Sequence, residues 1–267
     1  PGMNRNKIIT LRILTAVGAL VAWHLLTTVP APQKPLLDPF FFSTPIDVLR
    51  RTAEDITTYQ MWYDLYITLL ETALAFFIGV VSGIGLGFWF ARRELLAAVL
   101  DPFVQAANAL PRVVLAPIFA LWFGLGIWSK VALGFTLVFF IVFFNVYQGV
   151  KEVSPTVLAN ARMLGMNDRQ LLRHVYLPSA LSWVFSSLHT SVGFALIGAV
   201  VGEYLGSSAG LGYRIAQAEG VFDVTGVFSG MLVLMIFVVL IDGIVTMCER
   251  RLLVWRPAPA VTGTTQG

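Results

Sequence analysis

Long apolar segments alternate with shorter polar segments along the whole chain. Six of them hold about 20 mostly apolar residues, the length that a helix needs to cross the hydrocarbon core of a membrane. Apolar and polar positions do not alternate within them, so helices are favoured over the strands of a barrel. The pattern predicts an all-α polytopic membrane protein with about six transmembrane helices, at residues 9–29, 65–90, 103–123, 131–149, 179–205 and 226–247. Pro111 and Pro117 interrupt the third.

The composition agrees with a chain that is surrounded by membrane lipid. Hydrophobic residues make up 57% of it and charged residues 12%, which is about half the charged share of a soluble domain. The pI of about 9.2 does not indicate nucleic acid here, because the placement of the charges matters more than their sum. The single cysteine, Cys248, excludes an intrachain disulfide and a metal site built from paired cysteines.

Lysine and arginine are distributed unevenly between the segments that join the predicted helices. If the N-terminus is cytoplasmic, the outer side carries five of them: Lys34, Arg50, Arg51, Lys130 and Arg214. The inner side then carries twelve: Arg5, Lys7, Arg12, Arg92, Arg93, Lys151, Arg162, Arg169, Arg173, Arg250, Arg251 and Arg256. Because cytoplasmic loops are enriched in these residues, the bias predicts a multi-pass protein of the cell (inner) membrane with both termini in the cytoplasm.

The segment 150–178 is the one sizeable cytoplasmic loop that this topology predicts. Ser154-Pro155 is typical of a helix start, with serine as the cap and proline at the first helical position. Val157, Leu158, Ala161 and Leu164 follow at helical spacing, and Gly165 suits the left-handed residue that ends a helix. Asn167 and Gln170 indicate a capping box for a second helix, which leads to Pro178. An exposed amphipathic helix of this kind either docks in a groove of a partner, lies on the lipid, or packs on its own chain.

The same loop resembles a known family. Ala159-Asn160-Ala161-Arg162-Met163-Leu164-Gly165, nine further residues and then Val175-Tyr176-Leu177-Pro178 is similar to the EAA signature of the permease subunits of binding-protein-dependent ABC importers. Ala159 stands where that family usually has glutamate, and Asn160 where it has alanine. Residues 110–117 and 121–126, Gly202-Glu203-Tyr204 and Gly210-Leu211-Gly212 resemble the nitrate, sulfonate and taurine branch.

The resemblance implies a MetI-like type I importer permease fold that works by alternating access. It implies several partners: two ATP-binding cassette subunits, a second permease subunit taken to be a copy of this chain, and a periplasmic or lipid-anchored solute-binding protein. It divides the chain into an N-terminal helix and outer segment (1–64, with an amphipathic piece at 45–55), a core permease domain (65–250) and a cytoplasmic tail (251–267). The ATPase-coupling residues that it implies are Ala159, Asn160, Ala161, Leu164, Gly165, Val175, Leu177 and Pro178.

The energy source is expected on another chain. A P-loop needs a Gly-Lys dipeptide, and the sequence contains none. ATP and magnesium are therefore expected on the ATPase partners, with neither cofactor nor metal nor catalytic residue in this chain. One alternative is an ion-coupled secondary transporter using Glu71, Arg112, Glu203 or Asp242, although Glu71 and Asp242 are close enough to span ends to reach interfacial water. A membrane-embedded enzyme is the other, and it would need polar residues that converge at one depth, which the sequence does not reveal.

Four residues are candidates for the pathway or its gate. Arg112 follows Pro111 inside the third span, where a charge must face a cavity or a partner. It either attracts an anionic solute, such as nitrate, a sulfonate, taurine or a carboxylate, or pairs with an acid. Glu203 is either part of an outer gate or a solvated acid at a helix end. Gly198 and Gly202 share one face of the fifth span, as Gly79, Gly83 and Gly87 do on the second, and such faces allow close helix packing.

Gly206-Ser207-Ser208-Ala209-Gly210 matches the G-x-S-x-G pattern of a hydrolase nucleophile. That motif requires a preceding strand and a later histidine. A membrane helix precedes it here, and all three histidines lie upstream. A glycine-rich turn is therefore the expected structure.

Overall fold

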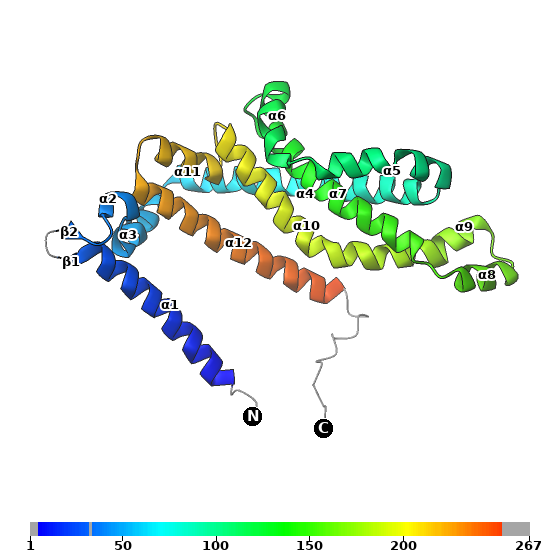
Figure 1. The fold of residues 1–267 in the computed structure, drawn as a ribbon, viewed down its shortest axis with the longest axis horizontal. Helices are drawn as coiled ribbons and strands as arrows, with labels where there is room; N and C mark the ends of the chain where they lie inside the picture. The colour runs from blue at the N-terminus through cyan, green and yellow to red at the C-terminus, as the bar shows by residue number, and fades with distance from the viewer. Residues whose placement is uncertain (1–4, 32–33, 253–267) are drawn as a thin grey trace.

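The computed structural model describes residues 5–31 and 34–252, which are nearly all helical (Figure 1). The only strands among them are two residues each and pair antiparallel in a small turn. The elements in chain order are α1 (Arg5–Thr28), β1 (Pro30–Ala31), β2 (Lys34–Pro35), α2 (Pro39–Phe42), α3 (Pro45–Ile56), α4 (Tyr59–Ala91), α5 (Glu94–Ala109), the 3₁₀-helix η1 (Arg112–Leu115), α6 (Ala116–Phe123), α7 (Ile127–Lys151), α8 (Pro155–Met163), α9 (Asp168–Leu171), the π-helix η2 (Leu172–Tyr176), α10 (Leu177–Leu205), α11 (Leu211–Gly220) and α12 (Val224–Leu252).

The prediction of about six membrane spans is confirmed. Five helices in the described part of the chain, α1, α4, α7, α10 and α12, are long and apolar enough to cross a membrane. The bent pair of α5 and η1–α6 supplies the sixth if it counts as one span. Figure 1 places α8 and α9 at one end of the long helices and α2, α3 and the strands at the other. We call these the coupling end and the loop end.

Glycines on α4 let α7 approach closely. A methyl group at Gly79 would lie 2.7 Å from Val138 Cβ, and one at Gly83 would lie 2.9 Å from Val142 Cβ. Gly87 stands in the same way opposite Val146. Valines at four-residue intervals on α7 therefore fill the row of glycines on α4, as expected for small-residue helix interfaces. These valines and Ala75 form the centre of the largest buried apolar cluster.

The third span bends far more than the sequence predicted. Its two halves, Leu95–Ala109 and Arg112–Phe123, meet at 85°, so α6 turns away from the other long helices (Figure 1). Leu110 is extended, with ψ at 133°, because the ring of Pro111 disfavours the helical conformation of the residue before it. Pro117 lies in the first turn of α6, where proline is tolerated.

The loop end is closed by the amphipathic helix α3, which confirms the predicted piece at 45–55. Thr44 caps it by accepting a hydrogen bond from Asp47 N (3.2 Å), and Pro45 occupies its first turn. Its buried positions Val48, Thr52 and Asp55 recur at helical spacing and face α12. α3 therefore packs on the core instead of standing free.

Candidate functional site

The segment between α7 and α10 folds as its sequence predicts. The Ser154 hydroxyl accepts a hydrogen bond from Thr156 N (3.3 Å) at the start of α8. Gly165 has a φ of +79°, the left-handed conformation that ends the helix. Asn167 and Gln170 form a complete capping box, each side chain bonding the backbone N–H of the other at 2.9 Å. Local sequence therefore determines the backbone conformation of this segment, residues 154–171, which we call the tip.

Some apolar side chains of α8 are buried against this chain, and others at its end are exposed. Ala161 is buried and Leu158 is half-buried against the chain itself. Leu164 is 80% exposed and its neighbour Met163 is 81% exposed. Three other residues of the predicted signature, Ala159, Asn160 and Gly165, are also exposed. The tip thus presents large apolar side chains that this chain does not cover.

The tip continues into α10 without a loop. α9, η2 and α10 follow each other residue by residue, and Leu177 N donates to Leu172 O across a π-helical turn. Pro178 has no N–H to donate, and its ring would clash with the carbonyl one turn before it. The wider π turn provides room for that ring. Leu177 and Pro178 are exposed, and Val175 is half-buried. The tip and α10 are therefore joined without an intervening loop.

Polar side chains converge inside the bundle near the loop end, where the sequence revealed no cluster. Glu71 of α4, Lys130 of α7 and Glu203 of α10 are each at most 1% exposed, and Glu71 interacts electrostatically with the other two. Lys130 Nζ donates to the carbonyl oxygens of Leu125 (2.5 Å) and Gly126 (3.1 Å). Charges this deeply buried require such partners.

The same cluster holds the glycine-rich turn after α10. Thr68 Oγ1 donates to Glu203 Oε1 (2.6 Å), and the other carboxylate oxygen accepts from Gly212 N (2.8 Å). Gly210 N donates to Asp64 Oδ1 (2.9 Å), and Leu211 N donates to Thr68 Oγ1 (3.0 Å). Gly210 has a φ of +110° and touches the Glu203 carboxylate, so a side chain there would be strained as well as crowded. The expected turn in place of a hydrolase motif is present.

Three interpretations of these charges require correction. Lys130 is not in an outer loop, because α7 begins at Ile127 and buries it. Glu203 is not a solvated helix-end acid, since it is 0% exposed. Glu71 does not reach interfacial water either, because its side chain is buried inside the bundle and only 1% exposed. This convergence could not be read from the sequence, because Glu71, Lys130 and Glu203 are far apart along the chain.

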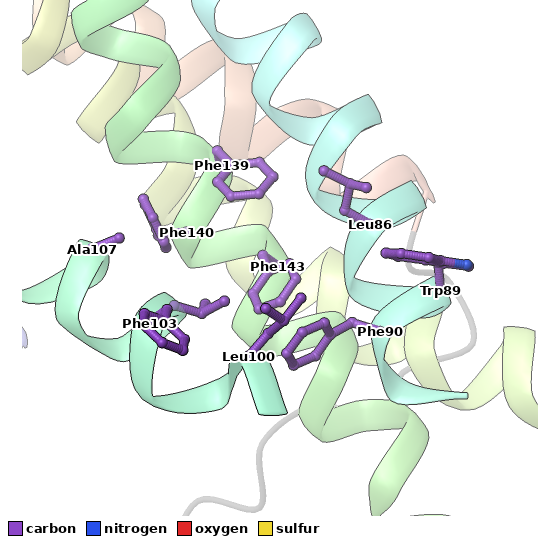
Figure 2. A pocket seen from close by; sticks show the side chains of 10 residues that line it. Leu86, Trp89, Phe90, Leu100, Phe103, Ala107, Phe139, Phe140 and Phe143 are labelled. Carbon is purple, nitrogen blue, oxygen red and sulfur yellow. The ribbon is translucent and has the colours of Figure 1, made fainter. Parts of the chain in front are cut away.

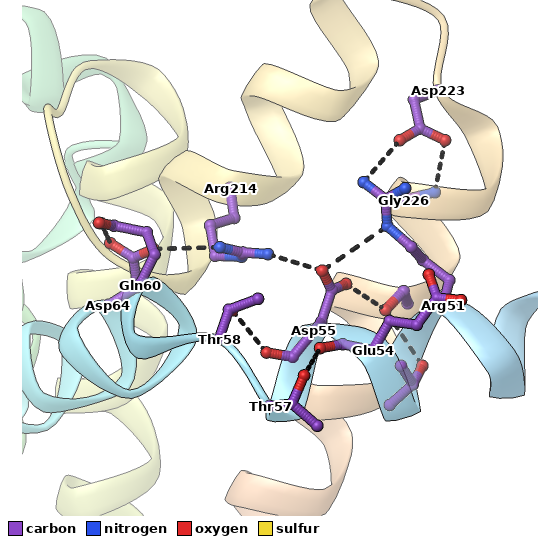
Figure 3. Close-up of polar contacts among 12 residues, drawn as sticks. Arg51, Glu54, Asp55, Thr57, Thr58, Gln60, Asp64, Arg214, Asp223 and Gly226 are labelled. Carbon is purple, nitrogen blue, oxygen red and sulfur yellow. Dashed lines mark hydrogen bonds and ion pairs between the residues drawn. The ribbon is translucent and has the colours of Figure 1, made fainter.

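A second polar network ties α3 to the rest of the loop end (Figure 3). Asp55 accepts hydrogen bonds from Arg214 (3.1 Å) and Ser229 (2.9 Å), and Arg51 lies 3.6 Å from it. Arg214 also pairs with Asp64 at 3.5 Å. Asp64 therefore belongs to both networks and joins the surface helix to the buried cluster.

Arg112 lies directly after the bend of the third span. Its Nη2 donates to the Asn108 carbonyl (2.8 Å) and side chain (2.6 Å), and its guanidinium lies 5.1 Å from the centre of the Phe140 ring. Its Nε is buried without a hydrogen-bond partner among the described residues. It lines a cavity of about 200 Å³ with Gly198, Phe194 and Ile197 of α10. The described residues include no acid that pairs with Arg112, so the cavity leaves this cation available.

The candidate glycines of α10 serve as contacts with α7. Gly198 touches the Gly134 backbone, and a methyl group at Gly202 would lie 3.0 Å from Lys130 Cγ. Gly198 also reaches the Arg112 cavity, whereas Gly202 is buried. Their close packing is what small residues permit at helix crossings.

A larger cavity between α4, α5 and α7 has a different character (Figure 2). It measures about 290 Å³, and its ten lining residues are all apolar or aromatic, including Phe90, Phe103 and Phe143. It offers no charged group to a polar solute. This cavity therefore gives no support to a path for a polar solute.

Comparison with known proteins identifies the architecture. Residues 62–254 match the family of binding-protein-dependent transport system inner membrane components, and this match includes the tip, the buried cluster and Arg112. The chain belongs to this family of ABC importer permeases. As a permease, it is a membrane transport subunit, and the ATPase activity of such a system resides on partner subunits.

Curated relatives agree on the family and differ in cargo. The formylaminopyrimidine transport permease protein ThiX of Halalkalibacterium halodurans is 34% identical over 218 residues, covering 82% of this chain and 87% of the relative. The putative aliphatic sulfonates transport permease protein SsuC of Bacillus subtilis is 32% identical, with coverage of 80% and 77%. The taurine transport system permease protein TauC of Escherichia coli is 27% identical, with coverage of 94% and 91%.

A solved structure supports the fold of the permease. The inward-facing MetNI methionine ABC transporter matches with a TM-score of 0.61 and 20% identity, over 72% of this chain and 97% of that one. The predicted MetI-like fold is confirmed.

Proposed function

We propose that this permease carries a small anion, such as a sulfonate, nitrate or a carboxylate, through a pathway that includes Arg112. The supporting observation is the Arg112 cavity. The guanidinium lies in the bent third span, its Nε has no hydrogen-bond partner among the described residues, and its hydrogen bonds go to the neutral Asn108. An uncompensated cation in a low-dielectric surrounding attracts negative charge strongly.

Transport in this proposal is alternating access driven by separate ATPase subunits that bind ATP and magnesium. Two copies of this chain form the pathway, both termini are cytoplasmic, and a solute-binding protein delivers the cargo at the loop end. Closure of the ATPases moves the exposed tip at Ala159–Gly165, and α9–η2–α10 carries that movement into the membrane. The uncovered Met163 and Leu164 support the docking of a partner there.

The cargo is tested through the binding protein that works with this permease. Its thermal unfolding is measured with taurine, an alkanesulfonate, nitrate, a dicarboxylate, formylaminopyrimidine and riboflavin. A ligand that binds only the folded protein raises the unfolding temperature, because it stabilises the folded state by RT ln(1 + [L]/Kd). Stabilisation by an anion supports the proposal, and stabilisation by riboflavin or formylaminopyrimidine alone contradicts the anionic cargo.

Arg112 is tested with the assembled transporter in proteoliposomes. We expect Arg112→Gln to reduce ATP-driven uptake of that ligand by about tenfold or more, because the charge that attracts it is lost. Arg112→Lys keeps the charge and should retain more uptake. The exposed Arg92→Gln, at the end of α4, is the matched control. Equal uptake by Arg112→Gln and Arg92→Gln would show that Arg112 has no part in transport.

A further inference from the structure

The aromatic cavity between α4, α5 and α7 is open to the surroundings of the chain (Figure 2). α5 contacts its neighbours near its start, where Ala97 is buried with Phe90 and Phe143. Its next turns line the cavity with side chains at helical spacing, namely Leu100, Phe103, Val104 and Ala107. Phe103 is 68% exposed, and Trp89, which lines the cavity from α4, is 51% exposed. The cavity is therefore a cleft in the side of the bundle and not a sealed void.

The lining of this cleft selects for an apolar ligand. All ten side chains around its 290 Å³ are apolar or aromatic, and an apolar cavity is not a site that water fills. If the cleft stayed empty, its walls would lose the dispersion contacts that a filled site provides. The acyl chains of lipids are the apolar groups that surround a protein spanning a membrane. Composition and setting together favour an acyl chain in the cleft.

Two cations lie near one end of the cleft, around Phe90. Arg93 follows α4, and its backbone N–H donates to the Phe90 carbonyl oxygen (3.2 Å). Lys151, at the end of α7, places its Nζ 4.5 Å from the centre of the Tyr147 ring. The Tyr147 ring in turn lies 5.4 Å from the Phe90 ring. Both Arg93 and Lys151 are exposed, so their charges are accessible beside the apolar cleft.

These cations are not neutralised by the chain. In the part of the chain that the structure describes, neither Arg93 nor Lys151 forms an ion pair. The nearby acids Asp101 and Glu152 instead accept hydrogen bonds from glutamine side chains one helical turn away, at 2.7 and 3.4 Å. The two cations are therefore free to bind an anion from outside the chain.

The neighbouring aromatic residues indicate the depth of this end of the cleft. Trp89 and Tyr147 stand in the last turns of α4 and α7, two helices that are long and apolar enough to span a membrane. Tryptophan and tyrosine are enriched at the level of the lipid headgroups. Arg93 and Lys151 follow them in the chain, so they lie at the level where phosphate groups are found.

We propose that the cleft binds one acyl chain of an anionic phospholipid, whose phosphate group pairs with Arg93 and Lys151. Basic residues at the ends of membrane spans attract anionic headgroups. An apolar helix of another subunit would fill the cleft but would leave both cations without a counterion, so charge complementarity favours the lipid. The acyl chain would complete the packing of α5 against α4 and α7. The inference depends on membrane insertion and not on the cargo or on the import function.

The lipid site is tested by native mass spectrometry of the assembled transporter. Phosphatidylglycerol and phosphatidylcholine with identical acyl chains are added separately, and the Kd of each is obtained from the number of lipids that stay bound. We expect phosphatidylglycerol to bind at least about tenfold more tightly, because two cations pair with its charge.

The headgroup contact is tested with a double variant. Arg93→Gln with Lys151→Gln should weaken phosphatidylglycerol at least about tenfold and leave phosphatidylcholine nearly unchanged. Both side chains are exposed, so these changes leave the core packing intact. Arg12→Gln with Lys7→Gln, on the exposed surface of α1, is the matched control and should retain the preference.

The acyl-chain contact is tested with a side chain that fills the cleft. Ala107→Phe should weaken both lipids at least about tenfold, because the ring occupies the space of the acyl chain. Ala98→Phe is the matched control, since Ala98 is exposed on the same helix and does not line the cleft. It should leave the binding of both lipids unchanged.

Equal affinity of the parent for the two lipids would overturn the inference, because an apolar cleft alone does not distinguish headgroups. An equal loss in the Arg12–Lys7 control would also overturn it, since the attraction would then be a general surface effect. If Ala107→Phe separates the transporter into its subunits and leaves lipid binding unchanged, the cleft is a subunit contact and the inference is wrong. No transport is measured, so a failure of the proposed import function would not affect this result.

Discussion

At the scale of single residues, Lys130 has the most constrained surroundings. Its ammonium group is fully buried, donates to two backbone carbonyls at the start of α7 and faces two carboxyl groups. Removing one member of a buried charged group leaves the others without compensation, which costs more than the group contributed as a whole.

We therefore expect Lys130→Met to destabilise the permease by about 3–5 kcal/mol. Thermal unfolding followed by tryptophan fluorescence in detergent measures the change. Lys7→Met, at the exposed start of α1, is the matched control and should have little effect. Combining Lys130→Met with Glu203→Gln should destabilise less than the sum of the two single changes, since the second removes the charge that the first leaves unpaired. Strictly additive effects would mean that Lys130 and Glu203 do not interact.

At the scale of helices, the contact between α4 and α7 depends on glycine at particular positions. Gly83 has no room for a side chain, because a methyl group there would lie 2.9 Å from Val142 Cβ. Gly85 lies two residues away on the same helix with nothing within 4 Å of an added methyl group. Substituting the two glycines by the same residue therefore distinguishes the effect of packing against α7 from the effect of helix propensity, because only Gly83 is crowded.

Gly83→Val should lower the unfolding temperature and the yield of folded protein, with a loss of about 1–3 kcal/mol from overpacking. Gly85→Val should change both little, because it adds the same side chain where the neighbours leave space. Thermal unfolding curves of Gly83→Val and Gly85→Val, recorded in the same detergent, measure this difference. Equal losses for the two variants would place the effect in the helix itself and not in its contact with α7.

The elements were largely predictable, because their causes are local. Apolar length predicted the spans, and Ser154, Gly165 and Asn167 predicted the boundaries of the tip through caps and a left-handed residue. The convergence of Glu71, Lys130 and Glu203 was not predictable, since it depends on how three distant helices are rotated against each other. Pro111 predicted a break but not its 85° angle, which is set by the packing of α6 on α7.

The candidate site was predictable only where local sequence determines it. The family signature predicted the tip, and the lone charge at Arg112 predicted a cavity or partner. Asp242 was considered as an ion-relay candidate or an interfacial acid but not as the partner of His189, because that pair requires the crossing of α10 and α12. Assignment of the chain to its parts at 1–64 and 65–250 remains a prediction, and most of the tail at 251–267 lies outside the described residues.

At the scale of the whole molecule, Gly165 lies between α8 and α9, in the exposed segment that leads into α10. Its φ of +79° is unfavourable for any residue with a side chain, and its surroundings leave open space. A substitution there therefore changes the path of the backbone without creating a clash.

We expect Gly165→Val to uncouple the transporter. The variant should insert and co-purify with the ATPase partner, and ATP hydrolysis should continue. Uptake per ATP should fall by about tenfold, because the misdirected tip no longer transmits ATPase closure to α10. Parallel measurement of phosphate release and solute uptake in proteoliposomes gives this ratio, with Gly85→Val as the control. Unchanged uptake per ATP would count against the tip as the transmission element.

α9, η2 and α10 follow one another without a break and could therefore move as one rigid rod. The 29 residues of α10 form a rod of about 44 Å. If such a rod tilts by about 5° around one end, the other end swings by about 4 Å, roughly the width of a small solute. A displacement at the α9 end that is too small to break the cap hydrogen bonds would then move the far end of α10 by the width of such a solute.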